Sequence, residues 1–140
     1  MATYVKFEAF VEHLAEKVHD CDLDTFKVML SNDAPSASLD AVKADLTSEI
    51  SAGNGYTAGG ADITTATSRT GGTLTVTATD TVFTASGGTI GPFRYAIIYN
   101  DTPTSPADPL VAYYDYGSSI TLADTETFTV DFGSSLFTLT

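Results

Sequence analysis

Apolar and polar residues alternate through most of the second half of the chain, which is the pattern of β-strands. Residues 73–79 are the clearest case, because Leu74, Val76 and Ala78 alternate with threonines. Threonine suits a pleated surface because its side chain branches at the β-carbon. Similar runs between turn residues predict further strands at 25–30, 63–67, 82–85, 110–114, 120–122, 127–132 and 136–139.

One predicted strand belongs at the centre of a sheet. Residues 93–100 form a β-branched and aromatic run that carries a single charge and lies between turn residues. Strict alternation would place Phe93, Tyr95, Ile97 and Tyr99 on one face. Because both faces are largely apolar, we expect a central strand that is covered on both sides.

The first part of the chain has a different periodicity. Residues 5–19 place apolar side chains at helical spacing, which predicts an amphipathic helix. Ser38 could cap a second, short helix over residues 39–50, where an apolar residue recurs every fourth position. A glycine-rich stretch at 53–60 then separates this part from the strands.

These elements predict one domain over residues 1–140. Residues 1–52 would contribute the helix, the first strand and a connector, and residues 61–140 a β-rich body. The first part alone is too small to bury a core. The expected fold is mainly β: an antiparallel β-sandwich or jelly-roll-like barrel with an N-terminal amphipathic helix. Three prolines predict a stiffened surface loop at 101–109.

The charge of the chain limits its partners. The 140 residues include eighteen acidic and six basic side chains, which gives a net charge of −12. Such a protein is repelled by nucleic-acid phosphates and by anionic lipid headgroups, so we expect no nucleic acid and no membrane among its partners. The sequence shows neither a leader pattern nor a long apolar span, so we expect synthesis in a cytoplasm.

The sequence predicts no catalytic residue, cofactor or metal site. The spacing of Asp20, Asp22 and Asp24 is typical of calcium loops, but the required glycine and distal glutamate are missing. His13 and His19 lie six residues apart and therefore would not share a helical face. A phosphate-binding loop requires a lysine after its glycines, and no lysine follows the glycine-rich stretch. We therefore expect a protein that is not an enzyme.

Tyrosines are dense between residues 95 and 116. Packing within the sheets would explain them, and so would a surface that contacts a protein or a carbohydrate. Prolines of the predicted loop and an aromatic residue of the helix could join such a surface. The candidate protein-contact residues are Phe10, Tyr95, Tyr99, Pro103, Pro106, Tyr113, Tyr114 and Tyr116.

Four segments carry a resemblance that covers most of the chain: residues 7–19, 24–35, 52–60 and 91–96. Their order and spacing resemble a family of small virion structural proteins of tailed bacteriophages. The resemblance implies a decoration or cement protein in the virion, on the outside of the head, which binds the major capsid protein as a homo-oligomer. It also implies that the protein is made in the cytoplasm of a bacterial host. The alternatives are a tail, neck or fibre-associated structural protein, or a carbohydrate-binding module for host attachment.

Overall fold

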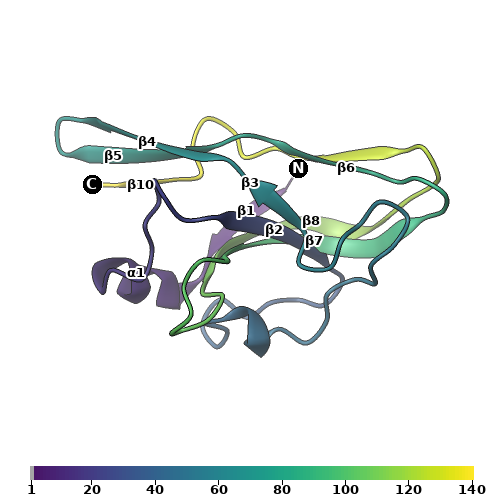
Figure 1. Ribbon diagram of the computed structural model, residues 1–140, viewed down its shortest axis with the longest axis horizontal. Helices are drawn as coiled ribbons and strands as arrows, with labels where there is room; N and C mark the ends of the chain where they lie inside the picture. Colours follow the sequence, from purple (N-terminus) through teal and green to yellow (C-terminus); the bar gives the residue numbers. More distant parts are fainter. Residues whose placement is uncertain (1) are drawn as a thin grey trace.

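The computed structural model describes residues 2–140 and is mainly β, with antiparallel strands and one short α-helix (Figure 1). The prediction of a mainly β, antiparallel protein is confirmed. The helical elements are α1 (Glu8–Ala15) and the 3-10 turn η1 (Lys43–Asp45). The strands are β1 (Thr3–Lys6), β2 (Phe26–Ser31), β3 (Ala61–Ile63), β4 (Thr65–Thr70), β5 (Thr73–Ala78), β6 (Thr81–Thr84), β7 (Ile90–Asn100), β8 (Leu110–Leu122), β9 (Thr127–Val130) and β10 (Phe137–Leu139).

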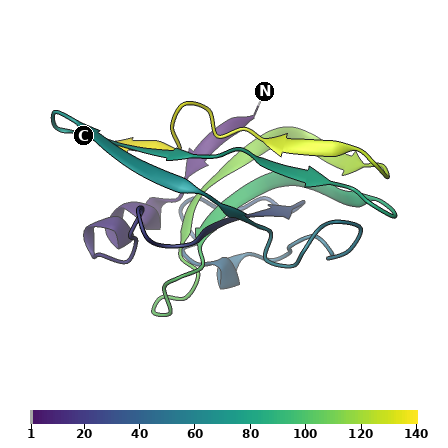
Figure 2. The same cartoon turned by 45° about the horizontal axis from the view of Figure 1, so that its top comes forward.

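The strands form two facing layers (Figures 1 and 2). One layer is a five-stranded sheet in the order β1-β8-β7-β2-β3, and the other combines the sheets β10-β5-β4 and β6-β9. The chain passes from one layer to the other at Thr64, between β3 and β4. Because β1 and β3 are unpaired on their outer sides, the large sheet does not close. The expectation of a jelly-roll-like barrel is therefore wrong.

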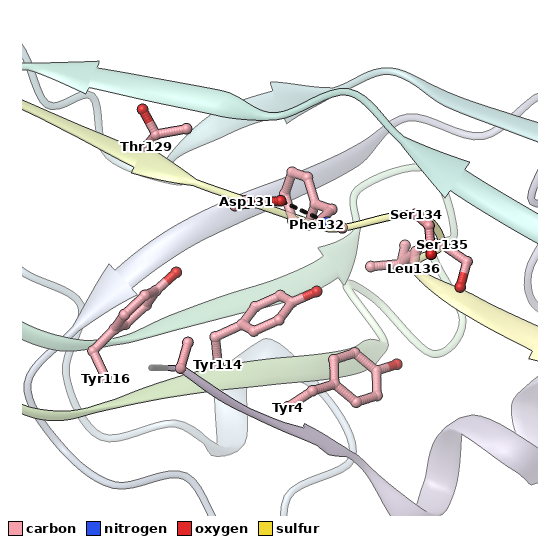
Figure 3. Close-up of a pocket in the computed structure, with 11 residues that line it drawn as sticks. Tyr4, Tyr114, Tyr116, Thr129, Asp131, Phe132, Ser134, Ser135 and Leu136 are labelled. Atoms are coloured by element: carbon pink, nitrogen blue, oxygen red, sulfur yellow. Dashed lines mark hydrogen bonds between the residues drawn. The ribbon is translucent and has the colours of Figure 1, made fainter.

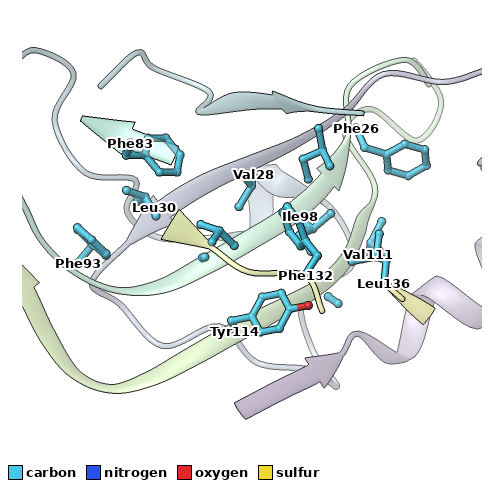
Figure 4. Close-up of a cluster of buried hydrophobic side chains, with 14 of the residues drawn as sticks. Phe26, Val28, Leu30, Phe83, Phe93, Ile98, Val111, Tyr114, Phe132 and Leu136 are labelled. Carbon is cyan, nitrogen blue, oxygen red and sulfur yellow. The ribbon is translucent and has the colours of Figure 1, made fainter. Parts of the chain in front are cut away.

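Strand β7 lies at the centre of the large sheet, as its apolar run predicted. Ala96 and Ile98 face the second layer and belong to the larger core, which we call the inner cluster (Figure 4). Ile97 and Tyr99 face away from it and belong to a smaller core, the outer cluster. All four side chains are at most 1% exposed. The prediction of a central strand covered on both faces is confirmed.

Irregular pairing between β7 and β8 changes the face of one predicted residue. Phe93 pairs with Ile120 and Tyr95 pairs with Asp115, so β8 uses more residues than β7 over this interval. The bulge rotates Phe93 into the inner cluster, whereas Tyr95 lies in the outer one. The expected grouping of Phe93 with Tyr95 is wrong. So is the expected turn at residues 117–119, which belong to the bulged part of β8.

The outer cluster is covered by the segment that was expected to form a second helix. Residues 39–50 contain only the 3-10 turn η1, so that prediction, including a cap at Ser38, is wrong. The carboxylate of Asp45 accepts hydrogen bonds from the backbone N–H groups of Ala41 and Val42, which favours a turn over a longer helix. Leu46 then packs against the outer cluster.

The N-terminal helix is shorter than predicted, because residues 3–6 form the edge strand β1. The apolar side chain at Val5 that fitted a helix instead pairs opposite Tyr113 on β8. Phe7, between the strand and the helix, lies in the outer cluster, and Phe10 lies in the inner one. The two halves of the chain therefore share both cores.

Close backbone packing explains part of the glycine-rich stretch. Gly60 has a φ of +83°, and a β-carbon built on it would overlap the carbonyl oxygen of Val28 on β2. Gly53 has a φ of +128° but no atom within 4 Å of such a β-carbon. A substitution at Gly53 therefore introduces backbone strain alone, whereas a substitution at Gly60 introduces both backbone strain and steric overlap.

We expect Gly60→Ala to destabilise the protein by about 2–5 kcal/mol, because strain and overlap add. Gly53→Ala should cost only about 1–2 kcal/mol, the strain alone. Urea unfolding followed by circular dichroism measures both free energies. Equal losses in the two variants would contradict the close approach of Gly60 to β2.

Candidate functional site

Several of the predicted contact residues lie in the cores. Phe10, Tyr95 and Tyr99 are 2%, 7% and 1% exposed. Phe10 packs edge-on against Phe137 of β10, and the two tyrosines belong to the outer cluster. These side chains pack inside the fold and present almost no surface to a partner. Tyr113 also packs against the outer cluster but is only half-buried.

Two other predicted tyrosines, Tyr114 and Tyr116, line a groove in which a third residue, Tyr4, takes part (Figure 3). The groove has a volume of about 560 Å³. Tyr4 on β1 pairs directly opposite Tyr114 on β8, and their ring centroids are 5.4 Å apart in an edge-to-face arrangement. Tyr116 packs edge-on against Phe128 of β9, at 4.9 Å.

The opposite wall of the groove is formed by Thr129 of β9 and by residues 131–136, which link β9 to β10. Small polar side chains predominate in this wall (Figure 3). Asp131 accepts a hydrogen bond of 2.7 Å from the backbone N–H of Gly133. The wall lining consists of Thr129, Asp131, Phe132, Gly133, Ser134, Ser135 and Leu136.

The groove keeps its tyrosines uncharged. Burial raises the pKa of Tyr4, Tyr114 and Tyr116 above the ordinary value of tyrosine. The nearby carboxylate of Asp131 raises the pKa of Tyr114 and Tyr116 further. The three hydroxyl groups therefore remain protonated at neutral pH and can donate hydrogen bonds.

The proline loop, residues 101–109 between β7 and β8, forms a second surface feature. Its prolines Pro103 and Pro106 are half-buried. The backbone N–H of Asp101 donates to the carbonyl of Thr25 at 2.9 Å. At the other end, the carbonyl of Asp108 accepts from the N–H of Lys43, also at 2.9 Å. The loop projects from the lower part of the molecule in Figure 1 and is fixed at both ends.

The proline loop is acidic. Burial raises the pKa of Asp108, and the negative charge of Asp101 raises it further, because two neighbouring carboxylates disfavour each other's ionised form. Lys43 acts in the opposite direction but less strongly than Asp101. A positively charged partner at this loop would relieve the repulsion between the two carboxylates.

A third feature is the pair His13 and His19, which were expected not to share a helical face. The chain reverses after α1 and brings the rings of His13 and His19 to a centroid distance of 6.1 Å. His19 is 7% exposed, and its Nδ1 lies 3.1 Å from Nδ2 of Asn100. That amide also donates to the carboxylate of Asp24 at 2.6 Å. Burial lowers the pKa of His19 to about 4, and His13 lowers it as well.

Within residues 2–140, no three histidine, cysteine, aspartate or glutamate side chains gather in a way that could hold a metal ion. Comparison with models of known protein families, with curated proteins and with solved structures found no match. In the same part of the chain, no helix has both the length and the apolar character needed to cross a bilayer.

The sequence found part of this surface and missed the rest. Tyr114 and Tyr116 were identified by the density of tyrosines, and the loop by its prolines. Tyr4 was missed because the predicted helix began at residue 5 and took the second half of β1, although the β-branched and aromatic run Thr3, Tyr4 and Val5 was the available signal. The polar wall of the groove had no signal beyond its turn residues.

We expect the stability of the protein to fall with pH between about 6.5 and about 4 through His19. The unfolded chain binds a proton with a pKa of about 6.5, whereas the folded state resists protonation until about 4. The neutral form therefore stabilises the fold above pH 6.5, and this contribution, about 3 kcal/mol, is lost as pH falls through the folded pKa.

Unfolding free energies of wild type and His19→Gln, measured by urea at pH 7 and pH 4.5, isolate this contribution because the carboxylates titrate in both proteins. The wild type should lose more stability than the variant. An NMR titration of His19 with a midpoint near 6.5 would contradict the prediction.

Proposed function

We propose that this protein is a non-enzymatic structural protein of a tailed-bacteriophage virion, a decoration protein on the outside of the head. In this role it binds the major capsid protein as a homo-oligomer and stabilises the shell. Support comes from the resemblance of residues 7–19, 24–35, 52–60 and 91–96 to small virion structural proteins. The net charge of −12 disfavours nucleic acid and anionic membranes as partners.

The two-layer architecture suits such a role as an open β-sandwich. A decoration protein stabilises a shell by mass action, since it binds the assembled state and not the disrupted one. Each contact can be weak, because symmetry repeats it over the particle and oligomerisation adds avidity. A rigid body transmits that binding energy without a cost for ordering the contact surface.

The acidic proline loop is the observation that favours this function most. Its backbone is held at both ends by hydrogen bonds to Thr25 and Lys43, which reduces the conformational entropy that the loop loses on binding a partner. Asp101 and Asp108 repel each other within it, which favours a basic surface as the partner. In the proposed complex, that surface belongs to the capsid.

We expect the double variant Asp101→Asn/Asp108→Asn to bind heads stripped of this protein about 3- to 10-fold more weakly, because it loses the attraction to a basic surface. Its binding should also depend less on salt concentration than that of the wild type. Asparagine tolerates the φ of +50° at Asp108, so the loop should keep its shape.

Asp124→Asn is the matched control. It removes one charge from the turn between β8 and β9, at the other end of the molecule in Figure 1, while its amide oxygen can still accept from the N–H of Gly87. Co-sedimentation with heads measures binding, and a thermal release assay measures shell stability. Full-occupancy binding that leaves particle stability unchanged would refute the cement role. Labelled protein seen by electron microscopy on tails, necks or fibres would assign those positions instead.

A further inference from the structure

We propose that the groove lined by Tyr4, Tyr114 and Tyr116 is a binding site for an uncharged saccharide. Tyr4, which is 36% exposed, and the half-buried Tyr116 form the aromatic surface, and the buried ring of Tyr114 supports Tyr4 from β8. Tyr4 and Tyr114 hold each other edge-to-face at 5.4 Å, and Phe128 holds Tyr116 at 4.9 Å. A sugar ring presents C–H groups on its faces and hydroxyl groups at its rim, so its face can pack on such aromatic side chains.

The polar groups of the groove match the rim of a sugar. Tyr4, Tyr114 and Tyr116 each bring one hydroxyl group to the lining of the groove. These hydroxyls point into the groove from one side (Figure 3). Thr129, Ser134 and Ser135 bring further hydroxyl groups from the other side. Each can donate and accept, as the hydroxyl groups of a saccharide do.

The charge of the groove selects against anionic ligands. Its described lining contains one carboxylate, Asp131, and no lysine, arginine or histidine. The net charge of −12 adds to the repulsion of phosphates, uronates and sialic acids. A volume of about 560 Å³ lies within the roughly 300–1,000 Å³ typical of small-molecule sites. An uncharged saccharide satisfies the size, the aromatic surface and the hydroxyl-rich walls together.

The groove differs from a site for an added β-strand. Such a strand would pair with the backbone of the edge strand β1, which is only four residues long. The groove instead offers side-chain rings and hydroxyl groups. A saccharide can contact both the aromatic rings and the hydroxyl groups of the groove, whereas a strand-like peptide would mainly form backbone hydrogen bonds with β1.

The test uses purified full-length protein and uncharged oligosaccharides: maltohexaose, cellohexaose, chitohexaose and a linear mannan oligomer. Saturation-transfer NMR detects binding. Tyrosine fluorescence gives the dissociation constant, because the chain contains no tryptophan. Polygalacturonate serves as the anionic comparison. We expect at least one uncharged oligomer to bind with a dissociation constant near 1 mM or below, and polygalacturonate to bind more weakly.

Variants connect that binding to the groove. Tyr4 is 36% exposed on an edge strand, so Tyr4→Ala should fold, and it should weaken binding about 3- to 10-fold. Tyr4→Phe keeps the ring and should retain part of the affinity. Tyr113→Phe changes a tyrosine on the other face of β8 and should leave binding unchanged.

Three outcomes would overturn the proposal. The first is no binding of any uncharged oligomer up to about 10 mM, where a ligand with a millimolar constant would be detected. The second is an equal effect of Tyr4→Ala and Tyr113→Phe. The third is self-association abolished by Tyr4→Ala without saccharide binding, which would make the groove an interface between copies. None of these measurements involves phage heads, so the result is independent of the proposed capsid role.

Discussion

The burial of β7 on both faces is the constraint on which the rest of the structure depends. A strand with Ile97 and Tyr99 on one side and Ala96 and Ile98 on the other needs a cover over each face. The second β layer covers the inner face. On the outer face, residues 2–140 place no further sheet. Phe7 and Leu46 pack there instead, and Leu46 follows a turn in which backbone N–H groups donate to the carboxylate of Asp45. The fold is therefore asymmetric, with a sheet on one side and an irregular segment on the other.

The pattern of apolar and polar residues predicted the correct element wherever it fitted a strand and did not also fit a helix. The threonine alternation around Val76 and the apolar run of β7 could only be strands. It was insufficient where two periodicities fitted the same residues. Residues 5–19 place apolar side chains at helical spacing, but strand pairing with Tyr113 on β8 determines the conformation of Val5. Leu46 and Ile50 also have helical spacing, yet they pack against different clusters. In each case, a contact distant in sequence decided against the local preference.

Of the two surface features, the proline loop could be predicted from local sequence and the groove could not. Proline content alone marked the loop between β7 and β8, because proline restricts the backbone whatever its neighbours are. The groove depends on the pairing of Tyr4 with Tyr114 and on the layers separating beside the polar segment after β9. Neither the strand pairing nor the gap between the layers can be predicted from the sequence of one strand. The density of tyrosines indicated an unusual surface, but half-buried and fully buried tyrosines look alike in a sequence, because their burial depends on what packs over each face of the sheet.

The pairing of β1 with β8 also has a consequence for how the molecule forms. Thr3 finds its partner only after Asp115 has been synthesised, and β2 can pair with β7 only after residues 95–100 have been synthesised. Loop-closure entropy must be overcome before these distant pairs contribute stability, so folding is slow for a chain of this length. During synthesis, the edge strand and the helix after it remain without a sheet, and their apolar side chains stay exposed. Commitment to the native topology comes late, when the β7–β8 hairpin provides the template on which earlier segments assemble.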